Sequence, residues 1–190
     1  MSSVAVIDGF AEGWQTSKIF REAIERAGYQ VTKEAGTADV IVAHSAGCFF
    51  LPDTHKGQLV FLVGPPYWPG RPVLVSLVQK LWRDFVYRKR EGRLGYWAKK
   101  HLWSLLYILT DIPHTIKLTF FVRHHDFRSR LQHTDFILVR NRDDSFCTPD
   151  IESIPFGNKK IGYHELPGEH DDLWANPGPY VKLIAKHLDF

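Results

Sequence analysis

Residues 40–47 read Val-Ile-Val-Ala-His-Ser-Ala-Gly, an apolar run that stops at a serine. The apolar run predicts a buried strand. Small residues two positions to either side, Ala43 and Gly47, allow the chain to turn sharply at Ser45 and to hold it in a strained backbone conformation. The usual pattern is G-x-S-x-G, and here Ala43 takes the place of the first glycine. The stretch therefore predicts a nucleophile elbow with Ser45 at its tip.

Strand-like and helix-like segments alternate around this stretch. We expect strands at residues 4–7, 29–32, 38–43, 58–63, 136–139 and 161–166. We expect helices over 15–27, from Leu74 onward, over 96–109, from near Ile116 after a break at Pro113, and over 180–188. This alternation predicts a three-layer, doubly wound α/β fold, with a mostly parallel sheet of about six strands between helices. Right-handed crossovers restrict the possible topologies, and among them we expect the strand order 2-1-3-4-5-6.

Residues 71–133, between the fourth and fifth strands, differ in composition from the rest. They carry 13 Lys and Arg against 4 Asp and Glu, whereas the whole 190-residue chain has a net charge of only +3. We interpret residues 71–133 as a helical cap inserted into a single domain of residues 1–190. We expect its apolar stripes to pack on the core and its basic side chains to lie in solvent.

The cap offers two kinds of binding surface. One is an apolar pocket for an acyl group. The other is peripheral contact with an anionic membrane through its basic residues, which are Arg83, Arg88, Lys89, Arg90, Arg93, Lys99 and Lys100. Nucleic-acid binding is not expected, because no recognised motif accompanies the charge.

A serine nucleophile needs a base, and the base needs an acid to orient it. Asp143 and Asp144 follow the expected fifth strand, and His170 follows the expected sixth strand. Because the carboxyl ends of parallel strands meet at one edge of a sheet, we expect Ser45, Asp144 and His170 to converge there. Asp143 is the alternative acid, and only one of the two adjacent aspartates is expected to serve.

Neighbouring polar residues have simpler interpretations. His44 is expected to pack behind the elbow, and Asp171 and Asp172 are expected to start a helix or to lie in solvent. Cys48 and Cys147 are expected to be small buried residues, and the cluster His124-His125-Asp126 is too incomplete to predict a metal site. With two cysteines and no secretory leader visible, we expect a cytoplasmic protein.

Four segments together resemble the α/β-hydrolase superfamily, and in particular its small single-domain serine hydrolases. Asp8-Gly9-Phe10 resembles the H-G-x turn of the family with Asp in place of His, and residues 43–47 match its elbow. Asp144 with the residues up to Pro149 resembles the acid loop, and Gly168-Glu169-His170 resembles the G-x-H loop. The resemblance covers residues 4–70 and 134–190.

The turn after the first strand adds an oxyanion hole to this set. We expect its donors to be the backbone N–H groups of Phe10 and Ala46. The Asp8 carboxylate beside this turn predicts a poor fit for anionic substrates.

These inferences predict a serine hydrolase that cleaves a carboxylic ester or related acyl compound through a Ser45–His170–Asp144 triad. The substrate is expected to be a small, apolar acyl compound bound by Trp14, Tyr67 and Trp68, with no cofactor and no metal. Two alternatives stay open at this point. One is a catalytically silent binding module of the same fold, which would act at a membrane surface. The other is an acyltransferase that uses the same triad.

Overall fold

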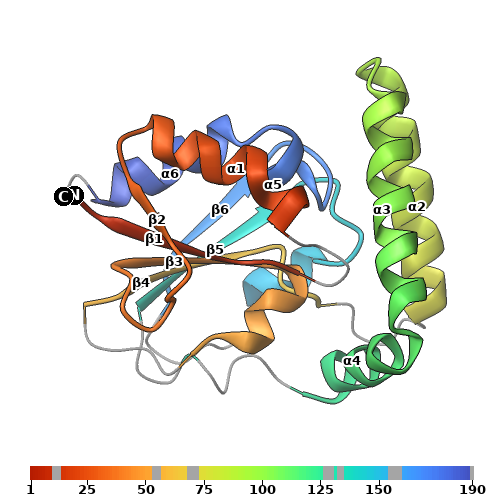
Figure 1. Ribbon diagram of the computed structural model, residues 1–190, viewed down its shortest axis with the longest axis horizontal. Helices are drawn as coiled ribbons and strands as arrows, with labels where there is room; N and C mark the ends of the chain where they lie inside the picture. The colour runs from red at the N-terminus through yellow and green to blue at the C-terminus, as the bar shows by residue number, and fades with distance from the viewer. Residues whose placement is uncertain are drawn as a thin grey trace.

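A six-stranded parallel sheet forms the centre of the molecule (Figure 1). The computed structural model describes residues 1–9, 14–52, 57–67, 73–125, 131, 135–153 and 160–188. The strands are β1 (Ser3–Ile7), β2 (Gln30–Thr32), β3 (Val40–His44), β4 (Leu59–Val63), β5 (Asp135–Asn141) and β6 (Lys160–Leu166). Their order, β2-β1-β3-β4-β5-β6, confirms the predicted topology.

Helices cover both faces of this sheet. The α-helices are α1 (Trp14–Arg26), α2 (Val73–Arg90), α3 (Leu94–Thr110), α4 (Ile112–His124), α5 (Asp172–Ala175) and α6 (Gly178–Leu188). Two 3-10 helices, η1 (Ser45–Phe50) and η3 (Pro149–Ser153), complete the described elements. One face carries α1, α5 and α6, whereas the other is covered by η1 and η3 (Figure 1).

The core consists of two apolar clusters, one on each face of the sheet. Successive strand residues point to opposite faces, so Val40 and Val42 belong to the cluster under α1 and α6, and Ile41 and Ala43 belong to the other. Both faces of the central strands are therefore buried. This explains why residues 40–43 form a continuous apolar run instead of an alternating one.

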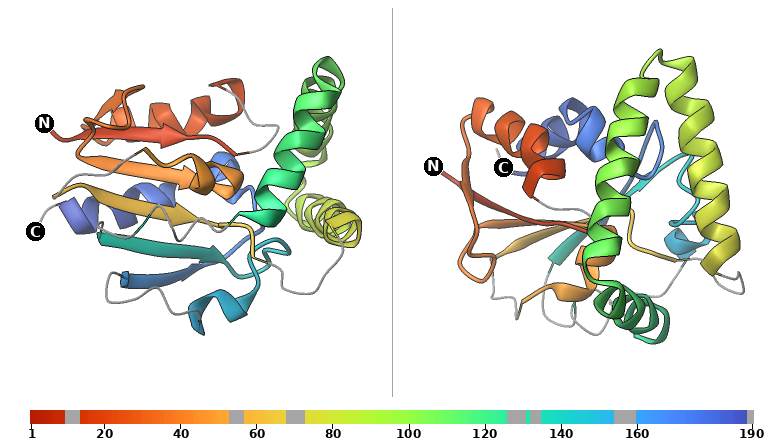
Figure 2. Two further views of the ribbon diagram at one scale, coloured as in Figure 1. Left: turned by 90° about the horizontal axis from the view of Figure 1, so that it is seen from below. Right: turned by 45° about the vertical axis from the view of Figure 1, so that its right-hand side comes forward.

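The cap lies at the carboxyl ends of the strands. Helices α2, α3 and α4 follow β4 and precede β5, as predicted. The α2–α3 hairpin stands upright beside the strand ends, and α4 lies across its base (Figures 1 and 2). Any group at the end of β3, β4 or β5 therefore faces the hairpin.

The start of α4 differs from the prediction. Pro113 was expected to separate two helices, but α4 begins at Ile112 and holds Pro113 in its first turn. Proline is tolerated there because the first backbone N–H groups of a helix have no intrahelical acceptor. The Asp111 carboxylate caps the same turn by accepting a hydrogen bond from the backbone N–H of His114 at 3.0 Å.

The side chains of the cap also differ from the prediction. Arg88 is fully buried and the side chain of Lys100 is 7% exposed, whereas Leu102 and Trp103 are each 57% exposed. The expectation of solvated bases over packed apolar stripes is therefore wrong for these residues. The bases are buried because each meets a carboxylate inside the molecule, as described below.

Two helices, α3 and α4, bear on whether the described part of the chain could cross a membrane. No single helix is long and apolar enough to cross a membrane. Helices α3 and α4 satisfy the criteria of length and composition only as a pair, and they are bent by 103° at their junction.

Candidate active site

The elbow lies at the end of β3. Ser45 is the first residue of η1 and has a φ of +52°, the only positive φ of a non-glycine residue in the described part of the chain. The backbone of β1 passes close by, because a Cβ at Gly47 would lie 2.5 Å from the carbonyl oxygen of Ile7 and 2.8 Å from that of Asp8. Glycine is therefore required at position 47, and strain is concentrated at Ser45.

Ser45, His170 and Asp144 form a hydrogen-bonded chain. His170 Nε2 lies 2.8 Å from Ser45 Oγ, and His170 Nδ1 lies 2.8 Å from Asp144 Oδ2. With the Nδ1–H tautomer, the ring donates to the carboxylate and accepts from the serine hydroxyl. All three side chains are buried. The structure thus brings together three residues that are up to 125 positions apart in the sequence.

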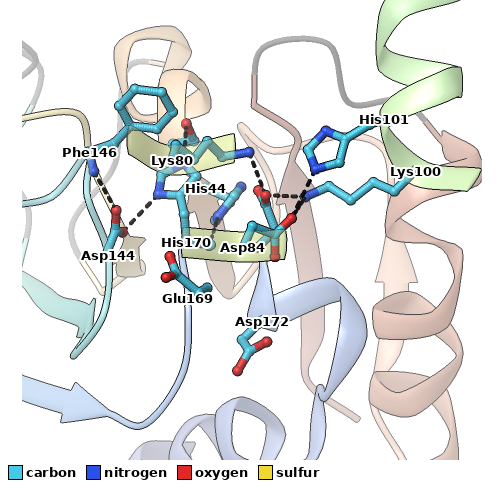
Figure 3. Close-up of polar contacts among 12 residues, drawn as sticks. His44, Lys80, Asp84, Lys100, His101, Asp144, Phe146, Glu169, His170 and Asp172 are labelled. Atoms are coloured by element: carbon cyan, nitrogen blue, oxygen red, sulfur yellow. Dashed lines mark hydrogen bonds and ion pairs between the residues drawn. The ribbon is translucent and has the colours of Figure 1, made fainter. Parts of the chain in front are cut away.

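The loop after β5 determines which aspartate faces His170. Asp144 is buried, and its Oδ1 accepts hydrogen bonds from the backbone N–H groups of Phe146 at 2.7 Å and Cys147 at 3.0 Å. Its other oxygen is left for the imidazole (Figure 3). Asp143 is exposed, and its backbone N–H donates to the carbonyl of Gly168. Of the two adjacent carboxylates, only Asp144 contacts the ring.

Polar groups beneath the loop hold the backbone of His170. His44 Nε2 donates to the carbonyl oxygen of His170 at 2.9 Å, so His44 lies behind the elbow as expected. Asn141 donates its side-chain amide to the carbonyl of Glu169 at 2.5 Å, and the hydroxyl of Tyr180 donates to Asn141 at 2.6 Å. These bonds restrict the positions that the imidazole can take.

Gly64, at the end of β4, lies against the His170–Asp144 pair, and the sequence analysis did not single it out. Its φ is +54°, and a Cβ there would lie 2.9 Å from Asp144 Oδ2 and 3.2 Å from His170 Nδ1. The turn Gly64-Pro65-Pro66 was visible in the sequence as a strand end. Its closeness to the imidazole depends on the neighbouring strand β5, whose Val139 pairs with Val63.

A cavity of about 810 Å³ opens above Ser45. Ser45, His170 and Phe146 contribute to its lining from the sheet domain, the name we give to the described residues outside the cap helices α2, α3 and α4. The remaining lining is mostly apolar and comes from α2, α3 and the loop after His170, namely Val78, Lys80, Leu81, Trp82, Phe85, Trp97, His101, Ser104, Leu105, Ile108 and Asp171. The cap therefore supplies most of the surface that a bound molecule would contact.

The aromatic residues predicted to bind substrate have other positions. Tyr67 is not among the described residues that line the cavity. Its backbone instead pairs with the acid loop, donating to the carbonyl of Phe146 at 2.8 Å and accepting from the N–H of Thr148 at 3.1 Å. Trp68 and the side chain of Trp14 lie outside the described residues. Trp82, Trp97 and Phe85 supply the aromatic wall, and the helical periodicity of the cap was the available signal for two of them.

A buried group of charges joins the cap to the residue after His170. Asp171 contacts the ammonium groups of Lys80, at 2.6 Å, and of Lys100. Burial would raise the pKa of the Asp171 carboxyl, but these two ammonium groups outweigh it and hold the pKa well below its usual range. Asp171 was expected at a helix entry or in solvent. It does precede α5, but it is buried, because the cap covers it with opposite charge.

A second set of buried charges involves Asp172, the residue that follows Asp171. Asp172 is the first residue of α5, which agrees with the expectation of a helix entry, but it is buried and contacts Arg88 of α2 instead of lying in solvent. Arg88 also contacts Glu91 at 2.8 Å and Asp84 at 3.3 Å. Asp84 Oδ2 in turn lies 2.9 Å from His101 Nε2. The two sets together tie α2 and α3 to the start of α5.

Glu169, the residue before His170 in the sequence, is not in any of the ion pairs found among the described residues. Its side chain is buried, and its Oε2 has no hydrogen-bond partner among the described residues. Burial, followed by the negative charge of Asp144, raises the pKa of Glu169 to about 8. The carboxyl therefore favours its neutral form next to the imidazole.

The expected oxyanion turn is described only in part. Ala46 follows Ser45 at the start of η1 and is buried, and the end of β1 lies against the elbow. Phe10 lies outside the described residues. Asp8 Oδ2 lies 3.3 Å from a guanidinium nitrogen of Arg21, so its charge is partly compensated. The expected repulsion of anionic substrates by Asp8 is correspondingly weaker.

One group of potential metal ligands occurs in the described part of the chain. His44, His170 and Asp171 have ligand atoms within 4.8 Å of one another. His170 uses both ring nitrogens in the hydrogen-bonded chain, and Asp171 is paired with two lysines. The group is thus already engaged in other interactions. Cys48 and Cys147 are buried free thiols, as expected.

Comparisons with known proteins bear on the fold. No protein-family model matches the chain, and no curated protein matches it in sequence. Solved structures do match. A hydrolase from Oleispira antarctica has a TM-score of 0.65 and 13% identity, over 100% of this chain and 91% of that one. The enol-lactonase of Burkholderia xenovorans LB400 has a TM-score of 0.68 and 12% identity, over 100% and 92%.

A third match is the esterase RhEst1 from Rhodococcus sp. ECU1013, with a TM-score of 0.67 and 12% identity, over 99% of this chain and 90% of that one. At this level of identity the likeness concerns the fold. The strand order, the elbow at the end of β3 and the loops after β5 and β6 agree with that likeness. The chain therefore has the α/β-hydrolase fold, as the resemblance of its motifs predicted.

Proposed function

We propose that this protein is a serine hydrolase that cleaves a carboxylic ester or a related acyl compound. The observation that supports the proposal is the hydrogen-bonded chain Ser45–His170–Asp144, with both distances at 2.8 Å and the serine at a strained turn. A hydroxyl, an imidazole and a carboxylate in this order are the parts that acyl transfer to serine requires.

Each side chain has a defined part in the proposed reaction. His170 Nε2 takes the proton of Ser45 Oγ as the oxygen attacks the acyl carbonyl, and Asp144 stabilises the imidazolium that forms. The tetrahedral intermediate then expels the alcohol, which receives that proton from His170. Water, activated by the same imidazole, attacks the acyl-serine, and the acid product leaves. The substrate must therefore carry an acyl carbon that Ser45 can reach.

The oxyanion of the intermediate needs donors that are already in place. The backbone N–H of Ala46 is the proposed donor next to the nucleophile, and the turn after β1 is the proposed source of the second, at Phe10. Each such donor contributes about 3 kcal/mol to lowering the barrier. The close approach of β1 to Gly47 supports this arrangement.

The proposed substrate has an apolar acyl or aryl group. The cavity of about 810 Å³ has an aromatic wall formed by Trp82, Phe85 and Trp97, which suits such a group. The polar members of the lining, which include Lys80, His101 and Ser104, are outnumbered by apolar ones. We expect turnover to rise with acyl chain length until the cavity is filled.

Labelling with a fluorophosphonate probe tests the proposal. We expect the wild-type protein to be labelled and Ser45→Ala not to be, and we expect hydrolysis of p-nitrophenyl esters to fall about 10⁶-fold in that variant. Stable labelling of Ser45→Ala would assign the nucleophile elsewhere. An unlabelled but folded wild-type protein would instead favour a silent binding module, and product analysis with added alcohols or amines would reveal an acyltransferase.

A further inference from the structure

The outer side of α3 exposes an unusual number of large apolar residues. The apolar cap face, as we define it, consists of Leu102, Trp103, Leu105, Leu106, Tyr107 and Leu109 of α3, all exposed. Leu102, Leu105, Leu106 and Leu109 are spaced so that they share one side of the helix. Helix α4 adds a second exposed stripe with Ile112, Ile116 and Phe120. Contiguous exposed apolar surface of this kind marks a contact with another apolar phase.

The charges around the apolar cap face are mainly positive. Residues 94–125 contain four Lys and Arg and a single acid, Asp111. Lys99 and Lys117 are exposed, whereas Lys100 is engaged with Asp171. Two copies of such a face would bring like charges together, whereas an anionic lipid surface would attract it. Trp103 and Tyr107 are also the residue types that settle where hydrocarbon meets water.

The mouth of the cavity lies next to this face. Three apolar residues line the cavity above Ser45 and are also exposed to solvent, namely Val78, Trp82 and Leu105. Leu105 also belongs to the apolar cap face. Solvent-exposed apolar side chains therefore continue from the outside of the cap into the space above the serine hydroxyl.

We infer that the apolar cap face docks on the surface of an anionic phospholipid bilayer, so that acyl substrates dissolved in that bilayer enter the cavity past Val78, Trp82 and Leu105. The docking depends on the exposed side chains alone, whereas the entry of substrate rests on the proposed hydrolase function. Lys100 is engaged with Asp171, so among the described bases of α3 and α4 the attraction is assigned to the exposed Lys99 and Lys117, together with the apolar residues of α3.

Vesicle flotation tests the docking without requiring hydrolysis. The full-length protein and Ser45→Ala are each mixed with vesicles of phosphatidylcholine or of equimolar phosphatidylcholine and phosphatidylglycerol. We expect both proteins to float with the anionic vesicles and to bind the neutral ones at least about tenfold more weakly. Failure of the wild-type protein to float with anionic vesicles would overturn the inference.

Two sets of variants separate the apolar and the charged contributions. The triple variant Leu102→Gln, Trp103→Gln, Leu106→Gln is expected to lose at least about tenfold in binding, and Ile19→Gln, an exposed apolar residue on α1, is the matched control. Lys99→Gln and Lys117→Gln are each expected to lose about fivefold. Binding by the triple variant at the wild-type level would overturn the inference, as would a stable dimer that only the triple substitution dissociates in light scattering.

A second arm measures a long-chain p-nitrophenyl ester dissolved in the anionic vesicles. We expect the triple variant to hydrolyse it at least about tenfold more slowly than Ile19→Gln, and Ser45→Ala to be inactive. If Ser45→Ala hydrolyses the ester while the vesicle binding is as expected, the proposed function fails and the docking surface stands. If the triple variant hydrolyses it at the control rate, entry from the bilayer is wrong.

Discussion

The sheet domain and the cap distribute their residues in opposite ways. In the sheet domain the strands bury apolar residues such as Val42 and Leu62 on both faces. In the cap, Asp84 and Arg88 are buried, and Leu102 and Trp103 face outward. The fold of the sheet domain thus follows from hydrophobic burial, whereas matched charges join α2 and α3 to the start of α5.

This difference gives the two regions different sensitivities. Removing one partner of a buried ion pair leaves an uncompensated charge, which destabilises more than the pair itself stabilises. Lys80 and Lys100 meet Asp171, the residue after His170. The position of the cap is therefore coupled to the loop that carries the imidazole, and the four predictions below test or refine this contrast.

The largest effect is expected in the sheet domain, at the carboxylate that faces the imidazole. In the proposed reaction, Asp144→Asn would keep the shape of the side chain but no longer stabilise the imidazolium or its Nδ1–H tautomer, so kcat for a p-nitrophenyl ester is expected to fall about 10⁴-fold. Asp143→Asn, one residue away and exposed, is the control and is expected to retain wild-type activity. Equal losses in the two variants would contradict the assignment of Asp144.

The next largest effect is expected in the cap. Lys100→Met leaves the buried Asp171 with one ammonium partner fewer, and we expect the free energy of unfolding to fall by about 3 kcal/mol. Lys99→Met, the exposed neighbour, is expected to change it by no more than about 0.5 kcal/mol. Urea denaturation measures both. A neutral result for Lys100→Met would mean that apolar packing, and not charge, holds the cap.

Gly64→Ala tests how closely β4 supports the His170–Asp144 pair. The new Cβ would crowd both side chains, and we expect kcat to fall by about 10- to 100-fold. Gly28 also has a positive φ, of +91°, but open space around it, so Gly28→Ala carries a backbone strain of about 1–2 kcal/mol without the crowding. A loss of activity in Gly28→Ala as large as in Gly64→Ala would assign the effect to general destabilisation.

The effect expected at Glu169 depends on pH and vanishes near pH 4.5. Its pKa is about 8 in the folded protein and near 4.5 when unfolded, so the folded state holds this proton more tightly. The contribution of Glu169 to stability is therefore complete below about pH 4.5 and is lost as the pH rises to about 8, by at most about 1.4 kcal/mol per pH unit.

Glu169→Gln is neutral throughout this range and is expected to escape that loss. Thermal unfolding of the two proteins should therefore agree near pH 4.5 and diverge toward pH 8, with the variant the more stable. Parallel curves from pH 4.5 to pH 8 would show that the carboxyl is not kept neutral by burial.

Much of the sheet domain could be predicted from the sequence. The apolar runs at residues 4–7, 40–43 and 136–139 each correspond to a strand, and the strand order is the expected one, within the set of topologies that right-handed connections allow. The order Ser45, Asp144, His170 also indicated which loops would meet, because parallel strands end at one edge. Local pattern and handedness suffice for such inferences.

The cap shows where sequence patterns do not suffice. The excess of basic residues predicted a solvated basic face. Arg88 and Lys100 are instead buried and paired with Asp172 and Asp171, which lie 84 and 71 positions away in the sequence. The aromatic wall of the cavity likewise comes from α2 and α3 and not from Tyr67. No local sequence pattern indicates either result, because both depend on how helices that are distant in the sequence pack against the rest of the molecule.

The sequence by itself determined the sheet, its strand order and the three loops in which Ser45, Asp144 and His170 lie, because burial periodicity and backbone handedness act locally. Only the tertiary structure decided that the two hydrogen bonds of His170 are each 2.8 Å long, that Gly64 lies against the imidazole, and that the cap turns its leucines outward. Those features depend on the packing of segments that are far apart in the chain.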